Sequence, residues 1–358
     1  MPSLKEIKGR INSISSTLAI TSAMKMVAAA KLQKAQMAIQ NMLPYERRLH
    51  SMLIDLMGAM NISAAASEDG SVRGSGSAER GFDQSGDRLS LSNRHDLAGM
   101  DGAYSLMAQR EVRKVAIVAF ASNSSLCGAF NSNAIREATA VINEYRASGL
   151  GDADITVYSV GRKMAEAMKK LGFPSPADFT KMSDSPSYDA ASALAQELFD
   201  GFVSGRFDKV ELVYNHYKST SSQPTTRQTY LPLSLADATA DLQAGKIADS
   251  ASESDTNRGA ETVGAPVVRQ GSPTTEDLIV EPSKEALIAT LLPKVIRLRI
   301  FTTLLDSAAA EHAARTVAMQ LATDNGNDLL QELTLEYNKG RQQKITSEIL
   351  DLVGGSMQ

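Results

Sequence analysis

The chain has 358 residues, of which 43% are hydrophobic and 22% charged, and its formal net charge is −4. This is ordinary for a globular protein of one or two domains, and the lack of a strong basic charge argues against nucleic acid as the main partner. Cys127 is the single cysteine, so an internal disulfide, a CxxC pair and a cysteine zinc cluster are excluded. We expect neither a signal peptide nor a membrane-spanning helix, because no apolar run has the required position or length.

The first 60 residues predict one very long helix with a coiled-coil seam. Apolar residues recur at alternating steps of three and four, interrupted at Thr21, Lys25 and Glu46. At about 1.5 Å per residue the helix is about 80 Å long, so it needs a partner of similar length. Pro44 predicts a kink or a local break. The seam positions are Leu4, Ile7, Ile11, Ile14, Leu18, Thr21, Lys25, Ala28, Leu32, Ala35, Ile39, Met42, Glu46, Leu49, Leu53 and Leu56.

Residues 63–110 are rich in Ser, Gly, Asp and Arg and have no period, which predicts a low-complexity insertion. Residues 111–235 then alternate apolar runs with helical patterns. This alternation predicts a small Rossmann-like α/β domain with a largely parallel sheet. The expected strands cover 114–121, 154–160, 210–216 and 227–232, and the expected helices cover 131–147, 161–171 and 188–203.

Residues 236–275 predict a second low-complexity insertion, followed by a strand-like stretch, DLIVEP, that ends at Pro282. A second long helix is expected over 283–355, with a seam of its own and with Gly326 weakening it by about 1 kcal/mol relative to Ala. Two long seams at opposite ends of one chain predict an intramolecular antiparallel pair. The predicted fold class is therefore α/β: a long antiparallel coiled coil of the two terminal helices plus the small Rossmann-like domain.

Few residues of the sequence suggest a catalytic or ligand-binding site. A loop rich in Ser and Gly follows the first strand and opens a helix, as phosphate-binding loops do, but it contains neither GxGxxG nor GxxxxGK[ST]. Cys127 paired with His216 is a conceivable nucleophile, although nothing in the sequence places a base beside it. The four histidines lack metal-ligand spacing, and His312 lies on the second seam, where packing or hydrogen bonding is expected. No catalytic residue, cofactor or metal is expected.

Cations recur near the start of the first helix and the end of the second. An antiparallel pair brings these two regions together at one end of the rod. They form either a solvated face or a surface for an acidic socket. The residues are Lys25, Lys31, Lys34, Arg315, Lys339, Arg341 and Lys344.

Several stretches carry a family resemblance. Residues 20–36 read ITSAMKMVAAAKLQKAQ, residues 308–326 read AAAEHAARTVAMQLATDNG, and residues 333–355 read LTLEYNKGRQQKITSEILDLVGG. The turn SLCGAFNSN at 125–133 is similar to an LCGG-N motif, with Ala129 in place of the second Gly. Together and in this order they resemble the γ subunit of F-type ATP synthases. Only the two insertions lack a counterpart in a typical family member.

The resemblance implies a non-catalytic rotor shaft inside a ring of α and β subunits, one copy per complex. It places the sheet domain near the ε subunit and the c-ring, with Leu126, Cys127, Gly128 and Asn131 in the domain's characteristic turn. Arg341 and Gln342 match residues that contact a catalytic β subunit. Met24, Lys25 and Arg315 match residues near the inner collar of the ring, and a polar Thr21 and Lys25 suit a surface that faces this ring.

The implied location is the cytoplasmic face of the cell membrane, peripheral to it through the c-ring, with no nucleic-acid partner. Two alternatives remain open. One is a Rossmann-like nucleotide-binding protein with a coiled-coil appendage, which depends on the loop at Ser125 and Gly128. The other is a coiled-coil scaffold that does not rotate. The coupling ion and the purpose of the two insertions are not determined by the sequence.

Overall fold

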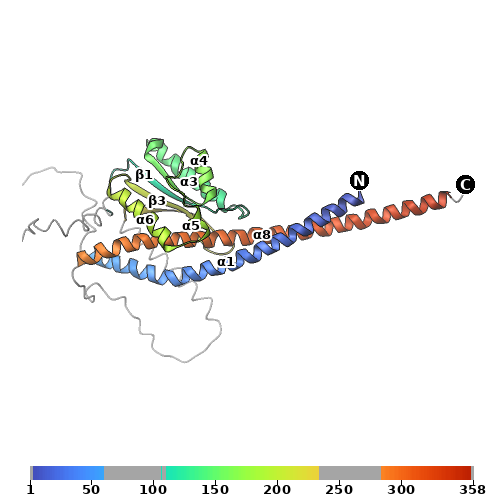
Figure 1. Cartoon of the computed structure of the whole chain (residues 1–358), viewed down its shortest axis with the longest axis horizontal. Coiled ribbons are helices and arrows are strands. Elements are labelled where there is room, and N and C mark those ends of the chain that lie inside the picture. Colours follow the sequence, from blue (N-terminus) through green and yellow to red (C-terminus); the bar gives the residue numbers. More distant parts are fainter. Residues whose placement is uncertain (1–2, 60–105, 107–109, 234–283, 356–358) are drawn as a thin grey trace, which may run out of the picture.

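A computed structural model describes residues 3–59, 106, 110–233 and 284–355. Two long helices, α1 (Leu4–Ala59) and α8 (Lys284–Gly355), run antiparallel and form a rod. A small sheet domain lies against the rod near the start of α8, while both termini lie toward the far end, where α8 extends beyond the start of α1 (Figure 1). The domain contains β1 (Val115–Phe120), α3 (Phe130–Ala147), a 3-10 turn η2 (Asp152–Asp154), β2 (Ile155–Val160), α4 (Arg162–Lys170), α5 (Thr180–Asp184), α6 (Tyr188–Val203), β3 (Lys209–Asn215) and β4 (Thr225–Leu231).

These elements confirm the predicted fold class and every predicted helix and strand that falls within the described ranges, with ends shifted by at most three residues. The sequence patterns missed η2 and α5, which are too short to show a period. The strand-like stretch 277–282 lies outside the described residues, as do nearly all of the two predicted insertions. Leu106, which falls in the first of them, is fully buried, and its carbonyl accepts the N–H of Leu233 at 2.9 Å.

The seam predicted for α1 is the face that packs on α8. All sixteen of its positions are buried or partly buried. Contacts along the rod show a constant register: Leu4 lies against Gly340, Leu18 against Gly326, and Leu32 against Ala309. As residue numbers rise on one helix they fall on the other, which is the antiparallel pairing expected from two terminal seams.

Two of the polar breaks in the seam have partners on α8. The hydroxyl oxygens of Thr21 and Thr323 lie 3.1 Å apart, and the Thr302 hydroxyl donates to Glu46 Oε1 at 3.1 Å. The polarity of Thr21 is therefore explained by a contact inside the pair. These hydrogen bonds add polar contacts to the apolar seam at two levels of the helix pair.

The local break predicted at Pro44 is wrong, because α1 continues through this residue without interruption. Proline removes one backbone hydrogen bond and costs about 3 kcal/mol in a helix interior. Packing of α1 on both sides of Pro44 offsets this cost. Met42 packs against the main hydrophobic core, and Leu49 and Leu53 are part of it.

The sheet has the strand order β2-β1-β3-β4. Strands β2, β1 and β3 are parallel, while β4 is antiparallel to β3 and forms one edge. All six residues of the central strand β1 are buried, as expected for a parallel strand covered on both faces. The prediction of a largely parallel sheet is confirmed.

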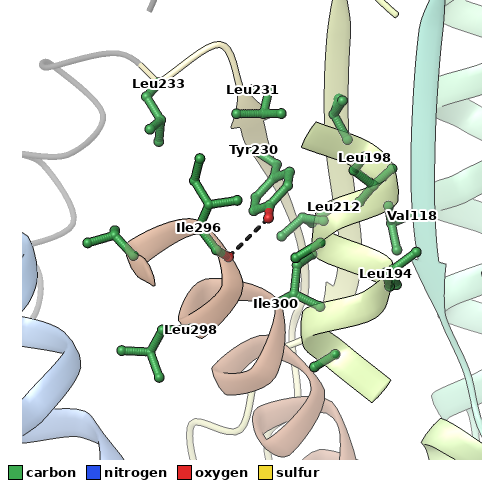
Figure 2. Close-up of a cluster of buried hydrophobic side chains, with 14 of the residues drawn as sticks. Val118, Leu194, Leu198, Leu212, Tyr230, Leu231, Leu233, Ile296, Leu298 and Ile300 are labelled. Atoms are coloured by element: carbon green, nitrogen blue, oxygen red, sulfur yellow. Dashed lines mark hydrogen bonds between the residues drawn. The ribbon is translucent and has the colours of Figure 1, made fainter. Parts of the chain in front are cut away.

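The two faces of the sheet are covered differently. Helices α3 and α4 cover one face, with Ala138, Val141 and Met164 against β1 and β2. The other face packs on α6 and on the first part of α8, and the hydroxyl of Tyr230 in β4 donates to the carbonyl of Ile296 in α8 at 3.0 Å (Figure 2). The rod and the sheet domain thus share one hydrophobic core, which also includes the last turns of α1.

We expect Gly326→Leu to weaken the helix pair. A Cβ at this position would lie 2.6 Å from the Leu18 Cδ2 atom, so a larger side chain overpacks the seam and costs about 1 to 3 kcal/mol. The free energy of unfolding of the isolated chain, measured in denaturant, should fall by this amount. The double variant Leu18→Ala with Gly326→Leu should recover most of it.

Gly9→Leu is the matched control. A Cβ at Gly9 has no neighbour within 4 Å, so leucine there should leave stability unchanged or raise it by up to about 1 kcal/mol through helix propensity. Equal effects of the two leucine substitutions would contradict the close approach at Gly326.

Candidate functional site

The turn between β1 and α3, residues 122–129 (the β1–α3 turn), is held in a strained conformation. Leu126 has φ +69 and Gly128 has φ +58, both in the left-handed region that bulky residues rarely adopt. The side chain of Asn131 organises the turn. Its Oδ1 accepts the backbone N–H of Ser122 at 3.0 Å, and its Nδ2 donates to Cys127 Sγ at 3.2 Å. Leu126 is consequently directed outward and is 58% exposed.

The β1–α3 turn is docked onto α8. Cys127 is buried together with Phe130 and Ala310 of α8. On the same side, Arg315 Nη1 of α8 donates to the carbonyl oxygen of Ser125 at 2.8 Å. Of the four turn residues predicted from the sequence, Cys127 and Gly128 face α8, whereas Leu126 points outward and Asn131 holds the turn together.

This docking removes support from the enzymatic interpretations. A phosphate-binding loop presents free backbone N–H groups to an anion, whereas this turn presents the Ser125 carbonyl to a guanidinium and packs its cysteine against α8. Cys127 contacts Ser122 and Asn131, while His216 binds Asp306, so the two are not a nucleophile and its base. Among the described residues no cluster of three or more His, Cys, Asp or Glu side chains could hold a metal ion.

Arg315 also forms a buried ion pair on α8. Its Nη2 lies 2.6 Å from Glu311 Oε1, and both side chains are about nine-tenths buried. Burial raises the pKa of the Glu311 carboxyl, and the nearby Asp184 of α5 adds to this, although Arg315 and Lys31 oppose it. The guanidinium is thus already engaged by Glu311 and Ser125 within the chain.

His312 lies next to this pair in a setting that disfavours its charge. Burial, together with the positive charges of Lys31 and Arg315, lowers the pKa of His312 to about 4. In the described part of the chain its Nδ1 has no hydrogen-bond partner. The neutral ring therefore packs in the seam, as the sequence suggested.

A second contact joins the sheet domain to α8 beyond β3. His216 Nδ1 and Asp306 Oδ2 lie 2.6 Å apart, and Asp306 Oδ1 accepts the backbone N–H of Tyr217 at 2.9 Å. The hydrogen bond to Asp306 raises the pKa of His216. Gln36 of α1 donates to the Tyr217 hydroxyl at 2.6 Å, so this contact reaches both long helices.

The other predicted site residues lie farther along the rod. Met24 and Lys25 are partly buried on α1. Arg341 and Gln342 are exposed on α8, just beyond Gly340, which faces Leu4 at the start of α1. From there α8 continues as a single helix whose side chains are exposed wherever they are described.

Sequence reasoning missed Glu311, Asp306, Tyr217 and Gln36. The sequence contains one pattern that includes Glu311. Residues 299, 303, 307, 311 and 315 are polar at every fourth position of α8, and all five are buried. In a sequence a polar row beside an apolar seam normally marks the solvent-exposed face of a helix, so only the burial of these five residues reveals a second partner for α8. Tyr217 and Gln36 are 181 residues apart, and no local pattern could have paired them.

The described residues define a protein of the coiled-coil shaft class, in which two long helices bear a small α/β domain. The family model described as ATP synthase matches residues 3–357. The ATP synthase gamma chains of Phocaeicola vulgatus and Bacteroides thetaiotaomicron are 47% and 45% identical to this chain, each over the whole of both chains. A chain in a cryo-EM structure of the Euglena gracilis mitochondrial ATP synthase (OSCP/F1/c-ring) has a TM-score of 0.52 and 18% identity, and the match covers 99% of this chain and 93% of that one.

This chain therefore belongs to the ATP synthase gamma-chain family. It is the central-stalk subunit and is not itself catalytic, since ATP is made and hydrolysed on the beta subunits. The resemblance drawn from the sequence is confirmed, and the nucleotide-binding alternative is not favoured. Within the described ranges, no helix has both the length and the apolarity needed to cross a bilayer.

We expect Arg315→Met to destabilise the chain by about 3 kcal/mol, because it leaves Glu311 buried without its cation. Denaturant unfolding of the isolated chain measures this. The double variant Glu311→Leu with Arg315→Met removes both charges and should recover most of the loss. If the double variant is as unstable as the single one, the bond to Ser125, and not the ion pair, is the main contribution of Arg315.

The two histidines should give opposite pH dependences of stability. The depressed pKa of His312 means that between about pH 6.5 and pH 4 the unfolded chain binds a proton that the folded chain does not, so stability falls as pH falls. His312→Gln should reduce this loss.

The raised pKa of His216 stabilises the folded chain below about pH 6.5, and this contribution is lost as pH rises through the pKa of the folded chain. His216→Gln should therefore remove the fall in unfolding free energy that accompanies this rise in pH. Unfolding free energies measured from pH 4 to pH 8 test both, and identical profiles would contradict the assignment.

Proposed function

We propose that the rod of α1 and α8 turns inside a ring of ATP synthase α and β subunits, while the sheet domain stays outside it, near the ε subunit and the c-ring. The observation that carries the proposal is the full-length family match of a chain whose rod projects far beyond the sheet domain (Figure 1). The Euglena gracilis structure supports these partners, since it is described as the OSCP/F1/c-ring part of an ATP synthase.

The physical mechanism follows from symmetry. A ring of three α/β pairs surrounds a rod that has no threefold symmetry, so the rod presents a different face to each catalytic subunit. Each subunit is then biased toward a different conformation, and rotation moves the bias around the ring. In this way proton flow through the membrane sector is coupled to ATP synthesis, or ATP hydrolysis to pumping, without a catalytic group on this chain.

We place the ring contacts at Met24 and Lys25 on α1 and at Arg341 and Gln342 on α8. Arg341 and Gln342 are exposed where α8 continues alone beyond the start of α1, so a surrounding β subunit can reach them. Large apolar side chains are also exposed on the same end of α8, including Ile345 at 47% and Leu352 at 74%, as a helix tip held in a sleeve requires. Arg315 contributes to the collar indirectly, because its side chain is held by Glu311 and Ser125.

The remaining parts of the proposal concern the membrane. One copy of the chain is peripheral to the membrane, which it contacts through the c-ring, and it lies on the cytoplasmic side. Its sheet domain transmits the rotation of the c-ring to the shared core with α8. No nucleic acid takes part. The proposed parts of the chain are the N-terminal helix up to residue 60, the α/β domain at 111–235 and the C-terminal helix from residue 283. The insertions occupy 63–110 and 236–275.

Charge reversal at Arg341 combined with Gln342→Ala should weaken coupling and leave the isolated chain folded, because both side chains are exposed on an unpaired helix. The measurement is the ratio of ATP-driven proton pumping to ATP hydrolysis in inverted membrane vesicles. Lys170→Glu, an exposed charge reversal on α4 of the sheet domain, is the matched control and should leave the ratio unchanged. Unfolding of the Arg341 and Gln342 variant would assign these residues to the helix pair instead.

Purification from native membranes tests the proposal as a whole. The chain should co-purify with the α and β subunits in one copy per complex. A chain that is recovered without them would exclude the rotor function and leave a scaffold that does not rotate.

A further inference from the structure

The sheet domain is joined to α1 differently at two levels of the rod. Toward the start of α8, the last turns of α1 belong to the shared core, with Leu53 and Leu56 buried in it. Farther along the rod a groove of about 460 Å³ lies between α1 and the domain, with Leu43 of α1 on one side and Tyr214 and His216 on the other. At this level the apolar core between α1 and the domain is interrupted, and polar side chains of both line the groove.

Tyr217 bridges the two helices beside this groove. Its backbone N–H donates to Asp306 Oδ1 of α8 at 2.9 Å, and its hydroxyl accepts from Gln36 Nε2 of α1 at 2.6 Å. Its ring packs against the small cluster that contains Leu32 of α1 and Ala309 of α8. One residue of the domain therefore contacts both helices by hydrogen bonds and by packing.

The hydrogen-bonding groups around Tyr217 restrain its position. Both oxygens of the Asp306 carboxylate are used, one by the Tyr217 N–H and the other by His216 Nδ1. The Tyr217 ring also packs in the cluster of Cys127 and Phe130, so it links this contact to the β1–α3 turn.

We propose that Tyr217 is a positioning residue for torque transfer, which sets the position of α1 relative to α8 just beyond the shared core. This inference rests on the rotor function proposed above. Torque applied to the domain reaches α8 through the shared core, whereas beyond that core the apolar contacts of α1 are mainly those of its seam with α8. The hydrogen bonds of Tyr217 to Gln36 and Asp306 couple α1 to the domain directly. Both helices, including their far ends, then rotate together with the domain.

The test uses the whole ATP synthase in inverted membrane vesicles. Tyr217→Phe keeps the ring but removes the hydroxyl, and Gln36→Met keeps the length of the side chain but removes the donor. Each should lower the ratio of ATP-driven proton pumping to ATP hydrolysis while hydrolysis itself continues. The double variant should lower the ratio no further, because both changes remove the same hydrogen bond. Thr139→Val, which removes a hydroxyl hydrogen bond inside α3, is the control and should leave the ratio unchanged.

Hydrogen exchange on the same complex reports the bridge itself. Asp306→Ala should speed exchange of the Tyr217 amide by about 2- to 10-fold, the range that follows from the net contribution of one hydrogen bond. Asp306→Asn keeps an acceptor oxygen and should restore protection. This arm does not depend on coupling, so it remains informative if a variant assembles poorly.

The outcomes separate the two proposals. The role of Tyr217 would be overturned if Tyr217→Phe and Gln36→Met left the pumping ratio unchanged, or if their effects simply added. It would also be overturned if Asp306→Ala left the exchange rate of the Tyr217 amide unchanged. If the unaltered chain is found without α and β subunits, the rotor function itself fails.

Discussion

The shared hydrophobic core is the constraint on which this structure depends. The first part of α8 is at once half of the rod and the layer that covers one face of the sheet, and the last turns of α1 join the same core. A domain attached by a linker could swivel on its shaft. Here the sheet cannot move relative to α8 without exposing Ile296, Ile300 and the strand residues against them, which are all buried. The domain is therefore held on this part of the rod by packing as continuous as that within either one.

Above that core the attachment becomes polar. Along α8 a buried row of polar side chains leads to Glu311 and Arg315, which hold the β1–α3 turn through the Ser125 carbonyl. Polar contacts are directional, so they specify one position of the domain where an apolar surface would tolerate several. The left-handed Leu126 and Gly128 belong to the same arrangement, since the turn must bend sharply to present both Cys127 and the carbonyl to the helix.

Much of the fold could be predicted from the sequence because it is periodic. The heptad seam of α1, the long pattern of α8 and the alternation of strands and helices are local signals, and each is found where it was expected. The errors also have physical causes. Pro44 lowers the local preference for helix, but packing on both sides outweighs it, and α5 is too short to carry a period. The turn residues 126–128 were identified by motif, although their docking on α8 was not.

By itself, the sequence determined that two long seams must pair, that a small parallel sheet lies between them, and that the chain resembles a rotor subunit, because seams, strands and motifs are written in neighbouring residues. Only the tertiary structure decided which groups meet across the junction. Arg315 with Ser125, Asp306 with Tyr217 and Gln36 with Tyr217 are separated by 190, 89 and 181 residues. Such pairs arise from the register of the two helices and from the position of the domain on α8, so no local sequence pattern contains them.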